Sequence, residues 1–383
     1  MNEHPILAQV VLGYCPRIDR ERKVSATRLT VFPQRPDATL DAQALLQALL
    51  EAWPGGEALM LNVAHEGLLR ELLELAPPRL AIEVPSFLAA DAGLAATFEA
   101  LHTRGATLLL NGRSAAELPP AVRAAFRQVI IGADDPPPPR GQPFVQAGVR
   151  SAEDVRLAFE RGAVAALGWP IDTPAQASGK PVAHDLQVIV ELINRVDRQE
   201  EIDRLEAVLK NDPTLAFRLV RYINSAAFGL RVEISSFRHA IMMLGYQKLK
   251  RWLALLLASA SNVPDMKPVM HAAVRRGLFL EELVRASDEQ MAGELFICGV
   301  FSLLDCMMGQ SFEALLRSIP VPQDVADALV QGSGRFRPYL DLVRAVEQES
   351  LFDIRQAAET LMLAPAEVNR ALLRAQRVAR QLD

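Results

Sequence analysis

Hydrophobic residues in the first half of the chain, up to about Trp169, form short runs separated by stretches with a helical period. Such runs, bounded by turn-forming residues, are typical of strands that alternate with helices. We expect strands at Ile6–Leu12, Val24–Val31, Ala58–Val63, Leu80–Val84, Thr107–Leu110, Gln128–Ile131, Phe144–Gln146 and Val164–Leu167. The helical pattern covers Asp41–Trp53, His65–Leu75, Ser86–Arg104, Ala115–Phe126 and Ser151–Arg161. This alternation predicts a (β/α)8-like barrel.

Two connections depart from the strand–helix alternation. The stretch Pro16–Lys23 is too short for a helix and predicts a hairpin between the first two strands. The sixth and seventh strands are joined only by DDPPPPRGQP, in which four consecutive prolines favour an extended path and exclude a helix. The barrel would be uncovered there, and we expect Pro136, Pro137, Pro138 and Pro139 to contact the other domain or a second copy.

The second half of the chain is helical almost throughout. A polar segment poor in helix formers, DTPAQASGK, indicates a linker. We therefore expect an α/β barrel domain at 1–171, a linker at 172–183 and an all-α bundle at 184–383. The expected helices of the bundle are 184–198, 200–210, 213–225, 236–244, 246–260, 267–287, 290–309, 311–318, 322–331, 337–349, 353–362 and 365–382.

Composition and charge exclude several classes of protein. The net charge of −5 gives no general attraction to nucleic acid or to anionic lipid. No apolar run is long enough to span a bilayer. Cys15, Cys298 and Cys306 cannot all pair internally, which favours a reducing compartment, and the pattern predicts buried thiols without a metal. We therefore expect a cytoplasmic protein with no cofactor, no nucleic acid and no membrane partner.

Two sets of motifs resemble known families. The segments LGYCPRIDRERKVSATRLTVF, LMLNVAHEGLL, LAIEVPSFL, GATLLLNGRS and AGVRSAEDVRLAFERGAVAALGWPI occur in the order found in EAL-type cyclic-diguanylate phosphodiesterases, in the shortened form that precedes HDOD domains. The stretch DPTLAFRLVRYINSAAFGLRVEISSFRHAIMMLGYQKLKRW resembles the central signature of the HDOD family of helical regulatory modules. The resemblance implies a shortened, incomplete EAL-type barrel followed by an HDOD bundle.

EAL phosphodiesterases hold two divalent cations through acidic side chains at the ends of barrel strands. By this resemblance, Asn62 and Glu83 are retained ligand positions, and the family's lysine falls near Ile131 or Gly132. The other family positions hold different residues here: Arg28, Asn111, Gly112, Ala147, Arg150 and Leu167. One carboxylate and two added arginines do not hold two dications, so we expect no metal, no catalytic residue and no hydrolysis.

Two interpretations remain open for the polar residues at this end of the barrel. Asn62 and Glu83 are vestigial ligands or caps of the following helices. Arg28, Arg113 and Arg150 would suit a phosphate of cyclic diguanylate, or they face solvent and pair with acids such as Asp134 and Asp135.

HD phosphohydrolases, the presumed relatives of HDOD domains, bind metal through His-Asp pairs. In this chain Ser302-Leu303 stand at that position, and His271 aligns with an upstream ligand. His184-Asp185 is expected to cap a helix instead, and His239 to be structural. Arg218, Arg221, Lys248, Lys250 and Arg251 are expected on a solvated face, or in a protein-contact surface with Tyr222, Phe228 and Trp252.

These observations favour a non-catalytic signal-transduction regulator of bacterial type that acts through protein–protein interaction. The expected partners are other signalling proteins or a second copy of the chain. The alternative is a cyclic-diguanylate receptor without hydrolysis, and a residual phosphodiesterase ranks third.

Overall fold

The computed structural model describes residues 4–53, 58–78, 80–113, 117–139, 141–172, 184–210, 237–259, 264–317, 319 and 321–380. The chain divides into two compact units. The barrel unit comprises Met1–Asp172 and Arg344–Leu373, and the helical unit comprises Thr173–Val343 and Arg374–Asp383. The segment Arg344–Leu373 thus lies with the barrel, whereas the sequence pattern grouped it with the helices of 184–383.

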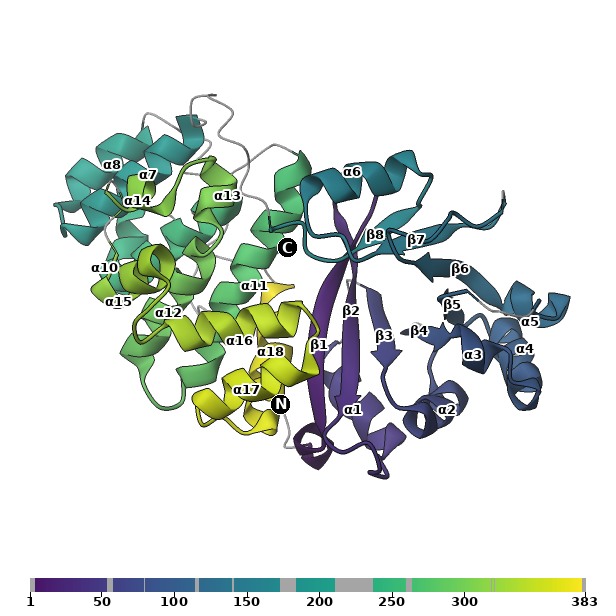
Figure 1. Cartoon of the computed structure of the whole chain (residues 1–383). Coiled ribbons are helices and arrows are strands. Elements are labelled where there is room, and N and C mark those ends of the chain that lie inside the picture. Colours follow the sequence, from purple (N-terminus) through teal and green to yellow (C-terminus); the bar gives the residue numbers. More distant parts are fainter. Residues whose placement is uncertain are drawn as a thin grey trace. The chain divides into compact units, whose positions relative to one another are not determined.

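Eight strands close the barrel in the order of the sequence, as Figure 1 shows for β1 to β8. The strands are β1 (Val10–Ile18), β2 (Val24–Pro33), β3 (Ala58–Val63), β4 (Leu80–Pro85), β5 (Thr107–Asn111), β6 (Phe126–Ile131), β7 (Phe144–Ala147) and β8 (Ala165–Leu167). β1 is antiparallel to both β2 and β8, and the other neighbours are parallel. The predicted hairpin between the first two strands is therefore confirmed.

The first strand lies further along the chain than the apolar pattern predicts. The expected strand Ile6–Leu12 begins instead with a short 3-10 helix, η1 (Pro5–Ala8), and β1 starts at Val10. Nearly every residue of β1 is buried, so the strand has no alternation of apolar and polar positions to fix its ends. The prediction of this boundary was wrong for that reason.

The helices of the barrel begin at side chains that cap their first turn. Asp41 accepts a hydrogen bond from the Ala44 amide, and Ser151 forms a capping box with Asp154. The expected helix Ser86–Arg104 is divided into three pieces. The elements before the helical unit are α1 (Ala42–Ala52), α2 (Glu66–Leu75), α3 (Ser86–Ala89), η2 (Ala92–Leu94), α4 (Ala95–Thr103), α5 (Pro120–Ala125) and α6 (Ala152–Glu160).

The connection between β6 and β7 contains no helix in its described residues, 132–139 and 141–143, as the prolines predict. Pro136, Pro137 and Pro139 are exposed and Pro138 is half-buried. Arg161, which follows α6, donates from Nη1 to the Ala133 carbonyl at 2.6 Å and so fixes the start of this loop.

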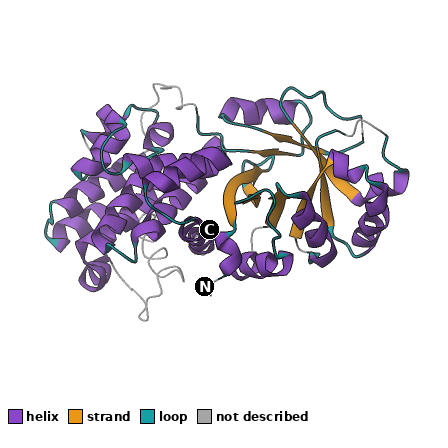
Figure 2. Cartoon of the chain, turned by 60° about the horizontal axis from the view of Figure 1, so that its bottom comes forward, coloured by secondary structure: helices purple, strands orange, loops and turns teal. Residues whose placement is uncertain are grey.

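Helices make up the described part of the helical unit, and the strands, orange in Figure 2, lie in the barrel unit. The elements from residue 184 onward, across both units, are α7 (His184–Asp197), α8 (Ile202–Lys210), α10 (Phe237–Ser259), η4 (Pro264–Met266), α11 (Lys267–Val284), α12 (Glu289–Phe301), α13 (Leu304–Met308), α14 (Phe312–Leu316), α15 (Gln323–Ala326), η5 (Asp327–Gln331), α16 (Arg337–Glu347), α17 (Leu351–Thr360) and α18 (Pro365–Ala379). The expected helices 236–244 and 246–260 form α10, which bends at Gly245 with a φ of 74°. Most of the HDOD-like signature, at 211–236, lies outside the described residues.

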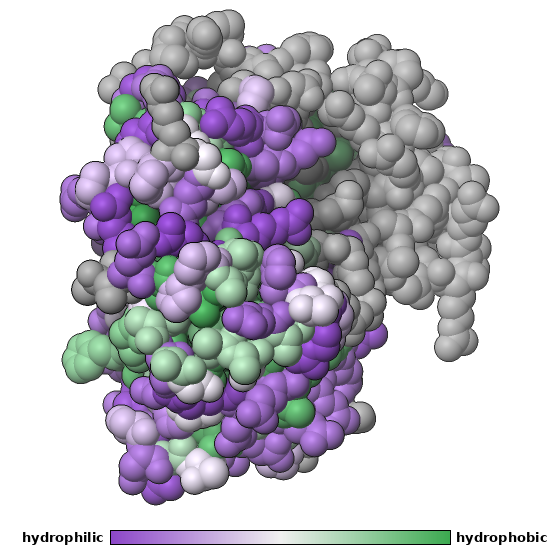
Figure 3. Space-filling view, turned by 90° about the vertical axis from the view of Figure 1, so that its right-hand side faces the viewer, coloured by the Kyte–Doolittle hydropathy of each residue, from purple (hydrophilic) through white to green (hydrophobic). Residues whose placement is uncertain are grey.

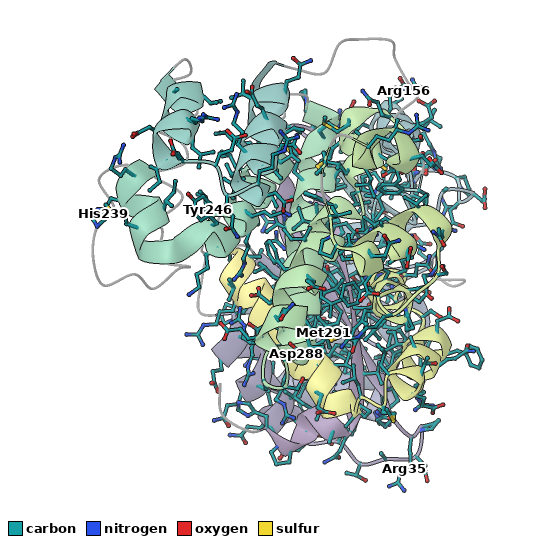
Figure 4. The ribbon with its side chains drawn as sticks, turned by 90° about the vertical axis from the view of Figure 1, so that its left-hand side faces the viewer. Arg35, Arg156, His239, Tyr246, Asp288 and Met291 are labelled. Carbon is teal, nitrogen blue, oxygen red and sulfur yellow. The ribbon has the colours of Figure 1, made fainter. Side chains whose placement is uncertain are left out.

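Local caps and long-range bonds stabilise the helical unit. Asp288 accepts a hydrogen bond from the Met291 amide at 2.8 Å and so starts α12; both residues are labelled in Figure 4. The Tyr246 hydroxyl donates to the Glu200 carbonyl at 2.9 Å and joins α10 to the turn before α8.

The surface of the barrel unit mixes residue types. The face seen in Figure 3 carries hydrophilic residues (purple) interspersed with apolar ones (green). None of the helices in the described ranges is both long enough and apolar enough to cross a membrane.

Candidate functional site at the barrel mouth

The strand register places the family's ligand positions on the inner face of the barrel. Residues that pair across neighbouring strands point to the same side of the sheet. Thr30 pairs with Asn62 between β2 and β3, and Ala147 pairs with Leu167 between β7 and β8. Arg28 pairs with Cys15 of β1. Together with Glu83 and Asn111, which lie in the same register, these positions share one interior, toward the carboxyl ends of the parallel strands, which we call the barrel mouth. Arg150 and Gly112 lie beyond the strand ends.

Arg28 and Glu83 form a two-pronged ion pair in the mouth. Arg28 Nε donates to Glu83 Oε1 at 2.7 Å, and Arg28 Nη2 donates to Glu83 Oε2 at 2.9 Å. Asn111 Nδ2 donates to the same Oε2 at 3.0 Å. The Glu83 side chain is completely buried. Both of its oxygens accept hydrogen bonds from side chains of the protein.

A second carboxylate reaches the mouth from the far end of the sequence. Glu349, in the turn between α16 and α17, accepts a hydrogen bond through Oε2 from Arg28 Nη1 at 2.9 Å. Its Oε1 accepts from the Thr30 hydroxyl, which in turn accepts from Asn62 Nδ2 at 3.2 Å. Glu349 is thus bound directly by Arg28 and Thr30, and Asn62 supports Thr30. No local sequence pattern around Glu349 indicates this contact.

The backbone at Glu349 is adapted to this approach. Glu349 has a φ of 54°, in the left-handed region that favours glycine. Opposite it, Gly13 of β1 has no side chain, and a Cβ there would lie 2.9 Å from Glu349 Cα. A glycine inside a strand commonly marks the close approach of another backbone, as it does here.

The same C-terminal segment completes the hydrogen bonding of β1. β1 pairs with β8 only at Arg17 and Ile18, which leaves its first half without a strand on that side. Asn369 Oδ1 accepts from the Leu12 amide at 3.0 Å, and Asn369 Nδ2 donates to the carbonyls of Leu7 and Val10, both at 2.8 Å. Figure 1 shows α17, drawn in yellow, beside the purple strand β1.

Burial and charge act against each other in the mouth. Burial lowers the pKa of Arg28, but Glu349 and Glu83 outweigh it, so the pKa lies above its ordinary value. Burial raises the pKa of Glu83, opposed by Arg28 and Asn111. Burial, reinforced by Glu349, raises the pKa of Cys15 well above its ordinary value, so this thiol is protonated at neutral pH.

The arginines expected to contact a phosphate do not converge in the structure. Arg28 is engaged by Glu83 and Glu349. Arg113 is exposed and donates to the Pro136 carbonyl. Arg150 is also exposed and pairs through Nε with Asp172 Oδ2 at 2.6 Å, rather than with Asp134 or Asp135.

The remaining expected positions carry no ligand atoms in their side chains. Gly112 has a φ of 83° and donates its amide to the Ile130 carbonyl beyond the end of β5. Ala147 is half-buried and Leu167 is buried.

Tyr222 and Phe228 of the expected interaction surface lie outside the described residues. The side chains of Trp252, His184 and Asp185 are likewise not described.

The HD-like position of the helical unit holds a guanidinium. Arg276 Nη1 donates to the Ser302 hydroxyl at 2.9 Å, and Ser302 Oγ donates to the Gly299 carbonyl at 2.7 Å. Arg276 and Ser302 are both buried. Burial, followed by the charge of Arg275, lowers the pKa of His271 well below its ordinary value, which keeps the ring neutral. Within the described ranges, no group of three or more His, Cys, Asp or Glu side chains is arranged to hold a metal ion.

One family model matches part of the helical region. Residues 182–310 match the family model of the HDOD domain. The chain contains a closed barrel of eight strands, followed by a helical region that includes the residues matching the HDOD model. The YkuI protein of Bacillus subtilis, solved with an EAL domain in complex with cyclic di-GMP and calcium, has a TM-score of 0.32 and 14% identity, covering 62% of this chain and 74% of YkuI.

Two curated proteins are similar in sequence. The protein YuxH of Bacillus subtilis (strain 168) is 23% identical over 215 residues, which cover 55% of this chain and 53% of YuxH. The cyclic di-GMP phosphodiesterase CdgJ of Vibrio cholerae serotype O1 is 26% identical over 243 residues, which cover 63% of this chain and 56% of CdgJ. The chain thus spans about half the length of the curated relatives it matches.

Proposed function

We propose that this protein is a non-catalytic regulator in cyclic-diguanylate signalling that acts by contacting other signalling proteins. The observation that carries the proposal is the engagement of both Glu83 oxygens by Arg28. By its resemblance to EAL phosphodiesterases, Glu83 corresponds to a ligand position of that family, and its negative charge is paired here with the Arg28 guanidinium.

The donor set of the mouth does not fit a pair of dications. Two cations held close together need several anionic oxygens. The mouth offers the carboxylates of Glu83 and Glu349, and Arg28 binds both. The amide of Asn111 turns its Nδ2 toward Glu83, so its donor rather than its acceptor faces the site. A divalent ion in this position would lie against a buried positive charge, and the two carboxylates that would have to hold the ion are already paired with that charge.

A turnover assay tests the absence of catalysis. The full chain is incubated with cyclic di-GMP and Mn²⁺ or Mg²⁺, and the linear product is quantified against a blank without protein. We expect no product above the blank. Product that depends on the metal and disappears in Glu83→Gln would refute the proposal, because the variant keeps the size of the side chain and removes the negative charge that a metal would need.

Binding without hydrolysis is a separate question. Arg28, Arg113 and Arg150 each have a partner in the chain and do not form a common site for a phosphate. Titration calorimetry with cyclic di-GMP is expected to give no heat of binding. Heat that is present in the native chain and lost in Arg28→Ala would favour the receptor over the adaptor, with Arg123→Ala, in an exposed ion pair, as the matched control.

A further inference from the structure

We propose that the turn Gln348–Ser350 is a latch that closes the barrel mouth, and that detachment of Glu349 from Arg28 and Thr30 opens it. This inference goes beyond the proposed function, because it concerns how the barrel changes state and not what the open barrel contacts. The turn and the mouth belong to one compact unit of the chain.

The turn has its own hydrogen bonds, which do not depend on the mouth. The Ser350 amide donates to the Ala345 carbonyl, and the Glu349 amide donates to the Val346 carbonyl. This pair of bonds is the Schellman arrangement that ends an α-helix. Ser350 then caps α17 by accepting from the Asp353 amide. The end of α16 and the start of α17 can therefore stay folded when the Glu349 side chain separates from Arg28 and Thr30.

The choice of residue at the turn points to a role for its side chain. The position after the C-cap of a Schellman motif favours glycine, since it requires a left-handed backbone. Glu349 occupies it at a φ of 54° and pays a conformational cost that glycine would avoid. What the glutamate adds is a carboxylate that reaches Arg28 and Thr30.

The two carboxylates of the mouth differ in their access to solvent. The Glu83 side chain is 0% exposed, whereas the Glu349 side chain is 16% exposed. Glu83 also keeps the two-pronged contact with Arg28, so the guanidinium stays paired when Glu349 leaves. Separating Glu349 from Arg28 thus costs less free energy than separating Glu83 from Arg28. Opening of the latch requires only the first of these two steps.

Cys15 is a natural reporter of the closed mouth. It pairs with Arg28 across β1 and β2 and is buried. Cys298, completely buried in α12, reports unfolding of the helical unit, and hydrogen exchange at the amides of β3 to β6 reports unfolding of the barrel unit. The experiment measures the rates at which a small thiol reagent labels Cys15 and Cys298 under native conditions, with each site quantified by peptide mass spectrometry.

In Glu349→Ala, the ratio of Cys15 labelling to Cys298 labelling is expected to rise by about tenfold or more, since a hydrogen bond to a charged group is lost. Glu349→Gly, which suits the left-handed turn, is expected to give the same rise in a well-folded chain. Glu359→Ala, at an exposed position of α17, is the control and should leave the ratio unchanged.

Two results would overturn the latch. An unchanged labelling ratio in both Glu349 variants would mean that the turn does not close the mouth. A rise of Cys15 labelling that is matched by faster hydrogen exchange across β3 to β6 in both variants would mean that Glu349 supports the fold of the barrel unit and not a local closure.

Discussion

Gly13 of β1 lies directly against Glu349, so that a Cβ on Gly13 would come within 2.9 Å of the Glu349 Cα atom. Neither backbone can move freely, because β1 is paired with β2 and Glu349 is held by Arg28 and Thr30. Adding a single methyl group at Gly13 therefore tests how tightly β1 packs against the Glu349 turn.

We expect Gly13→Ala to lower the free energy of unfolding by about 1–3 kcal/mol, the usual cost of overpacking. Urea denaturation measures the change. Gly293→Ala is the matched control: a Cβ there meets nothing within 4 Å, and alanine favours the helix α12, so this variant should be slightly more stable. Equal effects of the two substitutions would contradict the packing described for Gly13.

The Arg28–Glu83 pair is expected to behave as a unit. Arg28→Leu leaves Glu83 buried without its cation and should cost about 3–5 kcal/mol of unfolding free energy. The double variant Arg28→Leu with Glu83→Leu removes both charges and should cost clearly less than the single one. Denaturant unfolding of the full set gives the coupling energy, and a double variant as unstable as the sum of the singles would argue against the pair. Arg156→Ala, in solvent-exposed ion pairs, is the control and should change stability little.

Asn369 is expected to stabilise the first half of β1 on the side where β1 does not pair with β8. Its amide accepts from the Leu12 amide and donates to the carbonyls of Leu7 and Val10. Asn369→Ala should cost about 2–4 kcal/mol, because buried polar groups lose their partners, and should speed hydrogen exchange at Leu12.

Asn369→Asp distinguishes hydrogen bonding from packing. An ionised aspartate presents only acceptors to two carbonyls, so the variant should be unstable at neutral pH and recover in part as acid protonates it. An Asn369→Asp chain whose stability loss is independent of pH would contradict this reading of the contact.

His271 predicts a specific pH dependence of stability. Burial, then Arg275, lowers the pKa of this histidine well below its usual 6.5. The unfolded chain therefore binds a proton that the folded chain does not, and stability falls as pH drops below 6.5, by up to about 1.4 kcal/mol per pH unit. The loss ends below the folded-state pKa. Urea unfolding between pH 5 and 8 should lose this slope in His271→Gln and keep it in the exposed control His102→Gln.

Much of the barrel was accessible from the sequence, because its parallel strands are apolar runs bounded by turn residues. The runs at Ala58–Val63 and Leu80–Val84 match β3 and β4 to within a residue. β1 was misplaced because it is buried on both faces and follows an apolar turn beginning at Pro5. The expected helical ranges that start at Asp41 and Ser151 begin at the residues that cap α1 and α6, because the signal for a helix start is local.

The candidate site could be predicted from the sequence only in part. Arg28 and Glu83 could be assigned to the mouth by family resemblance, but their mutual ion pair could not, because charge alone does not fix which acid an arginine meets. Glu349 escaped notice since no local pattern connects a polar turn after a helix with a strand near the start of the chain. The one available signal was Gly13, an isolated glycine between the predicted strand Ile6–Leu12 and the predicted hairpin turn.

The hydrogen bond from Leu12 to Asn369 joins positions that are 357 residues apart. During synthesis on the ribosome, the first strand must therefore wait for nearly all of the chain before its backbone is satisfied on both sides. Folding of the barrel is for this reason late and non-local, and the nascent chain exposes a strand edge that a chaperone would have to shield.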